Sequence, residues 1–181
     1  MKKILSVLAI LLFIVNVNAQ EINWVSLEDA MALQKKEPRK IMIDAYTNWC
    51  GPCKMLDKNT FRNKDVADYV NKHYYAVKFN AEGNETIKFK GNTFTNPSYN
   101  PANANRRNSP HQLAAYFSVR SYPTIIYLDE KGELLSPVIG YKTPQQIEVY
   151  LKLFNENAHV NMKTQEDFSA YYSAFKPEFS N

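Results

Sequence analysis

Asn48-Trp49-Cys50-Gly51-Pro52-Cys53-Lys54 contains both cysteines of this 181-residue chain. The Cys-x-x-Cys spacing lets the two sulfurs meet when Cys50 caps a helix and Cys53 lies one turn further in. Unpaired N–H groups and the positive end of the helix dipole then stabilise the thiolate of Cys50. Gly51 keeps the turn slim, and Pro52 suits the first helical turn, where its missing N–H costs nothing. We therefore predict that Cys50 is a nucleophile and that Cys53 resolves the mixed disulfide.

Three other uses of a cysteine pair compete with this interpretation. A structural disulfide usually closes a longer loop, because a four-residue ring removes little entropy from the unfolded chain. A zinc site needs about four ligands, and the remaining candidates, His73, His111 and His159, have no paired spacing. We expect these histidines on the surface or at helix caps. A haem attachment site needs a histidine directly after Cys53, where Lys54 stands. The pattern favours redox chemistry, and we expect no metal.

The first residues have the pattern of a targeting segment. Lys2 and Lys3 precede an apolar run over residues 4–15, and a small-residue cleavage site ends at Ala19. The run is shorter than the about 20 residues that a membrane-spanning helix needs. We therefore predict a signal peptide over residues 1–19 and a mature protein that is periplasmic or secreted. An uncleaved anchor is the alternative.

The rest of the chain, residues 20–181, has the length and apolar content of one domain. Its apolar patterns alternate between helix and strand periods. The predicted helices lie at 27–33, 50–58, 64–72 and 110–117 and begin again at Thr143 and Thr164, with Ser26, Thr143 and Thr164 as N-caps. The predicted strands lie at 41–46, 74–80, 124–129 and 133–140. Pro137 predicts that the last strand is an edge strand or has a bulge. Aromatic residues on the final helix indicate packing, and a partner-binding surface is the alternative.

Residues 81–110 break this alternation because they are rich in asparagine and proline. A segment this long without periodicity is usually functional or disordered. Ile87, Phe89 and Phe94 could pin it to the core as a small hairpin. The basic pair at residues 106–107 is more typical of a solvated loop than of a binding site.

The sequence around the cysteines resembles a known family. Residues 49–54, Trp-Cys-Gly-Pro-Cys-Lys, match the active-site signature of thioredoxins, and the resemblance extends over about residues 24–154. Within that family the chain is similar to secreted proteins related to the periplasmic domain of the bacterial transmembrane disulfide reductase. In that subgroup a segment like residues 59–66 typically follows the motif. The resemblance implies an α/β thioredoxin-like fold, in which a central mixed sheet is flanked by helices on both faces. The N-terminal helix, the insertion at about 81–110 and an extra C-terminal helix within about 155–181 are added to it.

The resemblance also implies a buried acid. Asp44 stands six residues before Cys50 in an otherwise apolar strand, where a charge is costly unless it is partnered or protonated. By resemblance, Asp44 relays a proton to and from Cys53, and Lys78 is its partner. Solvent-facing positions for Asp44 and Lys78 are the alternatives. Thioredoxins carry a kinking proline after the second cysteine; here Lys58 stands near that position, which predicts a straighter or shorter helix ended at residues 59–60.

Residues near the cysteine pair are implied to bind substrate. Tyr122 and Pro123 lie in Ser-Tyr-Pro-Thr, which resembles the cis-proline loop of thioredoxins and presents its backbone to an extended substrate. Trp49, Gly51 and Pro52 shape the surface around the reactive sulfur.

These residues lead to the prediction of a thiol–disulfide oxidoreductase that acts on exported proteins. Gly51 and Pro52 between the cysteines favour the reducing direction. An oxidase or isomerase, and a partner-binding module with the cysteine pair as a redox latch, are the alternatives. The chain has no nucleotide-binding glycine motif and no second cysteine pair, so we expect no cofactor and a protein redox partner such as a membrane disulfide reductase. The net charge of +4 comes from scattered basic residues and does not indicate nucleic acid.

Overall fold

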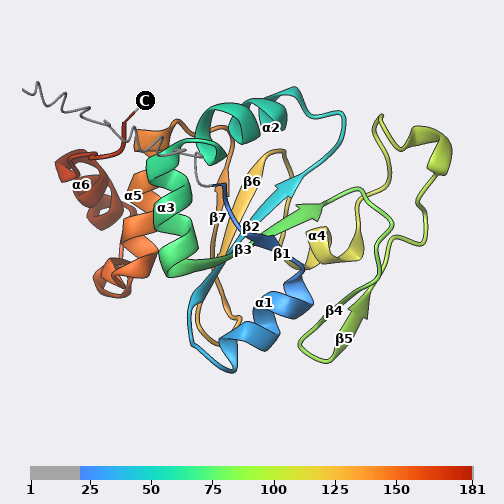
Figure 1. Ribbon diagram of the computed structural model, residues 1–181, viewed down its shortest axis with the longest axis horizontal. Helices are drawn as coiled ribbons and strands as arrows, with labels where there is room; N and C mark the ends of the chain where they lie inside the picture. The colour runs from blue at the N-terminus through green and yellow to red at the C-terminus, as the bar shows by residue number, and fades with distance from the viewer. Residues whose placement is uncertain (1–20, 181) are drawn as a thin grey trace, which may run out of the picture.

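A five-stranded mixed sheet forms the centre of the computed structural model, which describes residues 21–180 (Figure 1). The predicted signal peptide lies outside the described residues. The strands are β1 Trp24–Val25, β2 Lys40–Tyr46, β3 Tyr74–Asn80, β6 Thr124–Leu128 and β7 Leu134–Ile139, in the order β1-β3-β2-β6-β7. The first three are parallel, and β6 and β7 run antiparallel to their neighbours. Pro137 lies in edge strand β7, and the pairing with β6 is irregular between Tyr127 and Leu128, as predicted.

Helices cover both faces of this sheet, which confirms the predicted architecture (Figure 1). On one face lie α2 Gly51–Leu56, α3 Lys64–His73 and α5 Pro144–Asn155, and on the other lie α1 Leu27–Gln34 and α4 Gln112–Tyr116. The predicted caps Ser26 and Thr143 accept hydrogen bonds from the first turns of α1 and α5. No helix within residues 21–180 has both the length and the hydrophobicity for a membrane span.

Strand β2 positions the acid near the cysteine pair. It lies between β3 and β6, so almost all of its residues are buried. Its side chains alternate between the two faces: Ile41 and Ile43 pack with α1 and α4, whereas Met42 packs with α2 and α3. Asp44 shares the face of Met42. The strand register therefore places the carboxylate under α2 and opposite Lys78 of β3.

Helix α2 changes geometry earlier than predicted. The α-helical part ends at Leu56, and the chain continues as a π-helical turn over Asp57–Phe61. The wider turn accompanies two anchoring contacts: Thr60 Oγ1 donates to Lys142 O at 2.5 Å, and the buried Phe61 ring lies edge-on to Trp24. The helix therefore does not end at residues 59–60, because burial of these side chains carries it to Phe61.

The insertion is closed at its base and folded at its tip. His111 N donates to Ala81 O at 2.8 Å, and the buried Asn96 side chain donates to the backbone of Gly83 and Ser109. Between these contacts β4 Ile87–Phe89 and β5 Asn92–Phe94 form a hairpin, and a 3₁₀ turn follows at Pro101–Asn103. Ile87 and Phe89 are buried in the core and Phe94 packs against it, as the sequence predicted. His111 is the N-cap of α4, one of the two places predicted for the histidines.

The C-terminal extension packs on the outer side of α5 (Figure 1). Helix α6 Gln165–Ala174 is capped by Thr164, and its Phe168 ring stacks on Tyr150. The chain then returns to α5, where the buried Glu148 accepts hydrogen bonds from the backbone of Glu178 and Phe179. The aromatic residues of α6 therefore serve packing, at least at Phe168.

Candidate active site

The cysteine pair lies at the junction between β2 and α2. Cys50 and Cys53 form a disulfide. Cys50 is the N-cap of α2, with extended backbone angles, and its Sγ accepts a hydrogen bond from Cys53 N at 3.1 Å. Pro52 occupies the first turn, where no N–H is required. In the reduced protein the same backbone N–H can stabilise a thiolate on Cys50.

The two sulfurs belong to different hollows of the surface. Cys50 lines a groove of about 610 Å³, and Cys53 lines a pocket of about 680 Å³ on the other side of α2. Both side chains are nearly buried in the disulfide form, with 2% and 5% exposed. Exposure therefore does not distinguish the cysteines, but their surroundings do.

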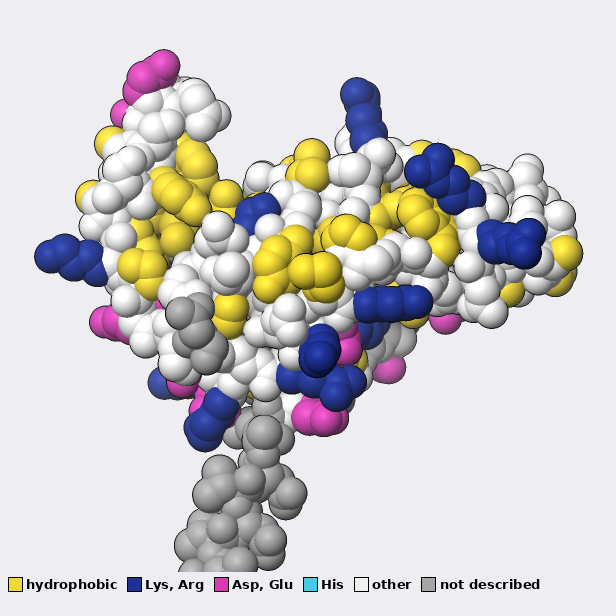
Figure 2. Space-filling model, turned by 90° about the horizontal axis from the view of Figure 1, so that it is seen from above, with side chains coloured by type: hydrophobic (Ala, Val, Ile, Leu, Met, Phe, Trp, Pro, Cys, Tyr) yellow, Lys and Arg dark blue, Asp and Glu magenta, His cyan; other side chains and the backbone are white. Residues whose placement is uncertain are grey.

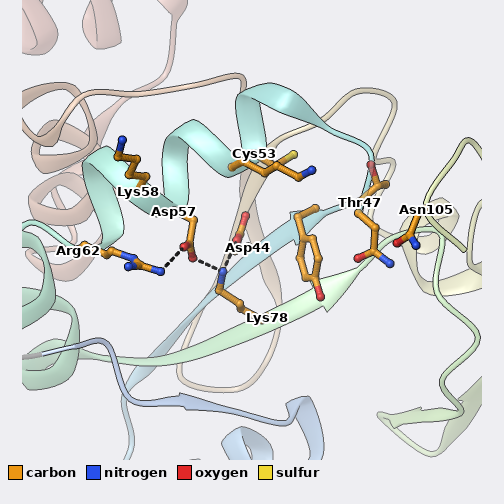
Figure 3. Close-up of a pocket in the computed structure, with 11 residues that line it drawn as sticks. Asp44, Thr47, Cys53, Asp57, Lys58, Arg62, Lys78 and Asn105 are labelled. Carbon is orange, nitrogen blue, oxygen red and sulfur yellow. Dashed lines mark hydrogen bonds and ion pairs between the residues drawn. The ribbon is translucent and has the colours of Figure 1, made fainter.

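Asp44 lines the pocket on the Cys53 side (Figure 3). Only 2% of this residue is exposed, and its Oδ1 atom has no hydrogen-bonding partner among residues 21–180. Burial raises the pKa of Asp44 to about 7, against the opposing attraction of Lys78. The carboxyl group therefore gains and loses a proton near neutral pH, within the pocket that Cys53 also lines.

Lys78 faces this pocket, but Asp44 is not its nearest partner. Lys78 Nζ lies 3.7 Å from Asp44 Oδ2 and 2.5 Å from Asp57 Oδ1. The ammonium group also lies over the rings of Trp24 and Tyr46, 5.0 and 5.5 Å from their centroids. In Figure 3 the Lys78 ammonium is linked to both carboxylates. The expected Asp44–Lys78 contact exists as part of a three-membered charge cluster.

Asp57 is the member of this cluster that sequence reasoning missed. It begins the π-helical turn and lies four residues after Cys53, so both side chains belong to the same side of one helix. Arg62 Nη2 is 3.5 Å from its Oδ2. The i, i+4 spacing from a cysteine was the available signal, and it required the assumption that the helix continues to Asp57.

The groove on the Cys50 side contains several of the predicted substrate-binding residues. Trp49, Pro52 and Tyr122 line it, and the Trp49 and Tyr122 rings meet edge to face with centroids 6.0 Å apart. The peptide bond before Pro123 is cis, but Pro123 itself is buried and does not line the groove, and its carbonyl accepts a hydrogen bond from Gly140 N. Gly51 is exposed, with open space around it, and does not line the groove.

The segment that contains this site matches a known protein family. Residues 27–155 match the family described as the thioredoxin-like domain. The chain belongs to this family. The resemblance drawn from the sequence is thereby confirmed, and the protein is a thioredoxin-like oxidoreductase with a redox-active Cys50–Cys53 pair.

The relatives of this thioredoxin-like protein are distant. It is 29% identical over 134 residues to the thiol:disulfide interchange protein DsbD of Photorhabdus laumondii, a match that covers 72% of this chain and 19% of that protein. It is 25% identical to the thioredoxin-like protein YneN of Bacillus subtilis, covering 67% of this chain and 69% of that one. The chain thus spans about a fifth of the length of DsbD.

Among solved structures, a thioredoxin-fold protein from Helicobacter pylori superimposes on this thioredoxin-like chain with a TM-score of 0.59. The two are 22% identical, and the match covers 76% of this chain and 81% of that one. This likeness supports the fold assignment.

Glu82 is a second residue of the thioredoxin-like site that sequence reasoning missed. Its Oε2 accepts hydrogen bonds from Trp49 Nε1 at 2.7 Å and from Asn108 N at 2.8 Å. Together with burial, which is the larger cause, its carboxylate raises the pKa of Tyr122 to about 12. Glu82 lies two residues after β3, and the preceding Ala81 N donates to Tyr46 O at the carboxyl end of β2. Sites in α/β proteins gather where parallel strands end. That rule was the available signal.

Proposed function

We propose that this protein reduces disulfide bonds of exported proteins. The observation that supports the proposal is the difference in the surroundings of the two sulfurs. Cys50 lines a groove with Trp49 and Tyr122, and Cys53 lines a pocket with Asp44. A partner's disulfide can approach the first sulfur while the second exchanges a proton with a buried acid.

The reaction begins with the reduced pair. The Cys50 thiolate attacks one sulfur of the partner's disulfide, forming a mixed disulfide and releasing the partner's other sulfur as a thiolate. Cys53 then gives its proton to Asp44 and attacks Cys50 Sγ, which breaks the mixed disulfide and releases the second partner thiolate. The two electrons of the new partner thiols come from the Cys50–Cys53 pair, which ends as a disulfide. Asp44 returns its proton as the released thiolate is protonated.

In this proposal Asp44 is a proton carrier, Cys50 the nucleophile and Cys53 the resolving thiol. A carboxyl group with a pKa of about 7 is present in both forms near neutral pH, as a proton carrier must be. Trp49, Pro52 and Tyr122 line the groove and, in this proposal, contact the partner's backbone and side chains. Gly51 and Pro123 act through the shape of the chain at the site.

The proposed source of electrons is another protein. The chain has two cysteines, so the oxidised pair must be reduced by disulfide exchange with a separate dithiol. The similarity to part of DsbD supports a membrane disulfide reductase as this partner. The predicted signal peptide supports action outside the cytoplasm, in the periplasm or as a secreted protein.

The reduction potential of the pair tests the proposed direction. A histidine between the cysteines would favour the thiolate and make the disulfide more oxidising, and Gly51-Pro52 provides none. We expect a potential near that of thioredoxin, about −270 mV. The measurement is equilibration of the mature protein with defined glutathione or dithiothreitol mixtures, followed by quantification of the disulfide. A value near about −120 mV would reverse the direction and favour the oxidase.

Alkylation of the reduced protein tests the assignment of the nucleophile. Cys50 gains the helix N-terminus and the Cys53 N–H, whereas Cys53 lies one turn further in and does not line the groove that a partner would enter. We expect Cys50 to react with iodoacetamide with a midpoint well below the ordinary cysteine value of about 8.5, and Cys53 to react far more slowly. Peptide mass mapping assigns each rate, with Cys50→Ser and Cys53→Ser as single-cysteine controls. Equal rates and midpoints for the two thiols would contradict the assignment.

A further inference from the structure

One wall of the Cys50 groove comes from the insertion at residues 81–110. Arg107, Asn108 and Pro110 line it, facing Trp49 and the loop before Pro123. This wall is held in place at two points. Asn48 Nδ2 donates to Ala104 O at 2.9 Å, and Trp49 Nε1 donates at 2.7 Å to the carboxylate of Glu82, a residue of the insertion that also accepts from Asn108 N. The insertion is therefore joined to the residues that flank the cysteine pair, and its side chains have defined places in the groove.

The charged side chains that line this groove differ in how many hydrogen bonds and ion pairs they make with the rest of the protein. Those that line it within residues 21–180 are Glu82, Arg107 and Arg120. Glu82 is partly buried, and its Oε2 already accepts two hydrogen bonds from the protein itself. Both arginines are exposed, and neither side chain has an ion-pair or hydrogen-bonding partner in the described part of the chain. The charge that the groove offers to an incoming chain is therefore positive.

Arg107 is oriented by Trp49. The guanidinium carbon lies 5.0 Å from the centroid of the Trp49 ring, within the range of a cation–π contact. A guanidinium that lies over a ring engages its face, so its N–H donors remain available to a carboxylate. The residue next to the nucleophile thus holds a cation in reach of the chain that binds there. Figure 2, which looks down on the α2 end of the molecule, shows basic side chains spread over this face, several of them beside hydrophobic surface.

We propose that the groove selects partner proteins that carry an acidic side chain close to their reactive cysteine, with Arg107 of the insertion and Arg120 of the loop before Pro123 as the residues that bind it. The occupant of the groove is an extended segment of the partner protein, which lies between the insertion and the Tyr122 loop while its sulfur meets Cys50. This inference rests on the proposed disulfide exchange and adds to it the chemical class of substrate. It also assigns a role to Arg107, which the sequence alone favoured as part of a solvated loop.

The test uses three synthetic peptides with one cysteine each. They carry Glu, Gln or Lys at the second residue on each side of the cysteine, which is capped as a disulfide with neutral 2-mercaptoethanol. The full-length mature protein is reduced, freed of reductant and mixed with each peptide, and the released peptide thiol is quantified by mass spectrometry over time. We expect each arginine to raise the ratio of the Glu-peptide rate to the Lys-peptide rate about threefold, because an exposed charge pair stabilises a complex only modestly. The two arginines together should make the Glu peptide react about tenfold faster than the Lys peptide. In about 1 M salt, where screening is nearly complete, the ratio should approach one.

Variants identify the residues responsible. Arg107→Gln and Arg120→Gln should each lower the Glu-to-Lys rate ratio about threefold, and the double variant should bring it close to one. Arg106→Gln removes an exposed neighbouring charge that does not line the groove, so it should keep the wild-type ratio. These are surface substitutions, and reduction of neutral hydroxyethyl disulfide checks that each variant retains its thiol chemistry.

The outcomes separate this inference from the proposed function. If the wild-type protein reduces all three peptides at one rate, or if the double variant keeps the preference for Glu, selection by the two arginines is wrong while disulfide exchange stands. If Arg106→Gln removes the preference as strongly as Arg107→Gln, general surface charge is responsible and the assignment to the groove is overturned. If the wild-type protein reduces neither the peptides nor hydroxyethyl disulfide, the proposed function itself fails, and this inference fails with it.

Discussion

Replacing Cys50 with Ser is expected to slow disulfide exchange by on the order of 10³-fold or more, because Cys50 is the sulfur that lines the groove and Cys53 does not reach it. Cys53→Ser should instead stop the reaction halfway. Cys50 can still attack a partner, but the mixed disulfide is then not resolved. The measurement is reduction of insulin for both variants, together with isolation of disulfide-linked adducts from the cell envelope of a host that expresses Cys53→Ser.

The double variant Cys50→Ser/Cys53→Ser is the matched control, since adducts that depend on Cys50 must disappear from it. A known thioredoxin with its resolving cysteine replaced shows that the trapping conditions work. Failure to recover any adduct on Cys50 under those conditions would contradict an exchange enzyme. Full insulin reduction by Cys50→Ser would contradict the role of Cys50 as nucleophile.

Asp44→Asn is expected to change how stability depends on pH. The pKa of Asp44 is raised from 3.8 to about 7 by burial, so between these values the folded protein binds a proton that the unfolded chain has lost. The free energy of unfolding therefore falls as pH rises through this window, and is lowest above pH 7, where the charge is buried. The shift of about three pKa units corresponds to at most about 4 kcal/mol. Asparagine has no proton to lose and therefore buries no charge at high pH, so the variant should be more stable than the wild type above pH 7.

Urea unfolding of the oxidised proteins at pH 5 and pH 8 measures this difference. Glu166→Gln, a change to an exposed carboxylate of α6, is the control and should follow the wild-type pH dependence. Parallel pH profiles for the wild type and Asp44→Asn would contradict the raised pKa. The same variant tests the proton carrier: we expect slower exchange, and a wild-type exchange rate between pH 6 and pH 9 would show that Asp44 carries no proton in the reaction.

Several elements near the site were predictable because short-range physics decides them. The helix after Cys50, the buried strand β2 and the caps Ser26 and Thr143 follow from turn chemistry, continuous apolar character and side chains that bond within their own turn. Because side chains alternate between the two faces of a strand, Asp44 and Met42, two residues apart, lie on the same face of β2. The path after Leu56 was not predictable in this way. The π-helical turn depends on contacts of Thr60 and Phe61 with residues distant in sequence.

The sequence by itself therefore determined the position of the redox pair, because it depends on residue spacing within one element. Through the resemblance to thioredoxins it also predicted the fold class and the buried acid. Only the tertiary structure decided what surrounds them. In the tertiary structure the nearest carboxylate to the Lys78 ammonium is that of Asp57, and the Asp44 carboxylate is further away. Glu82 and Arg107 both contact the Trp49 side chain. These contacts depend on how far the π-helical turn and the insertion carry the chain, which is set by packing across the whole domain rather than by any local pattern.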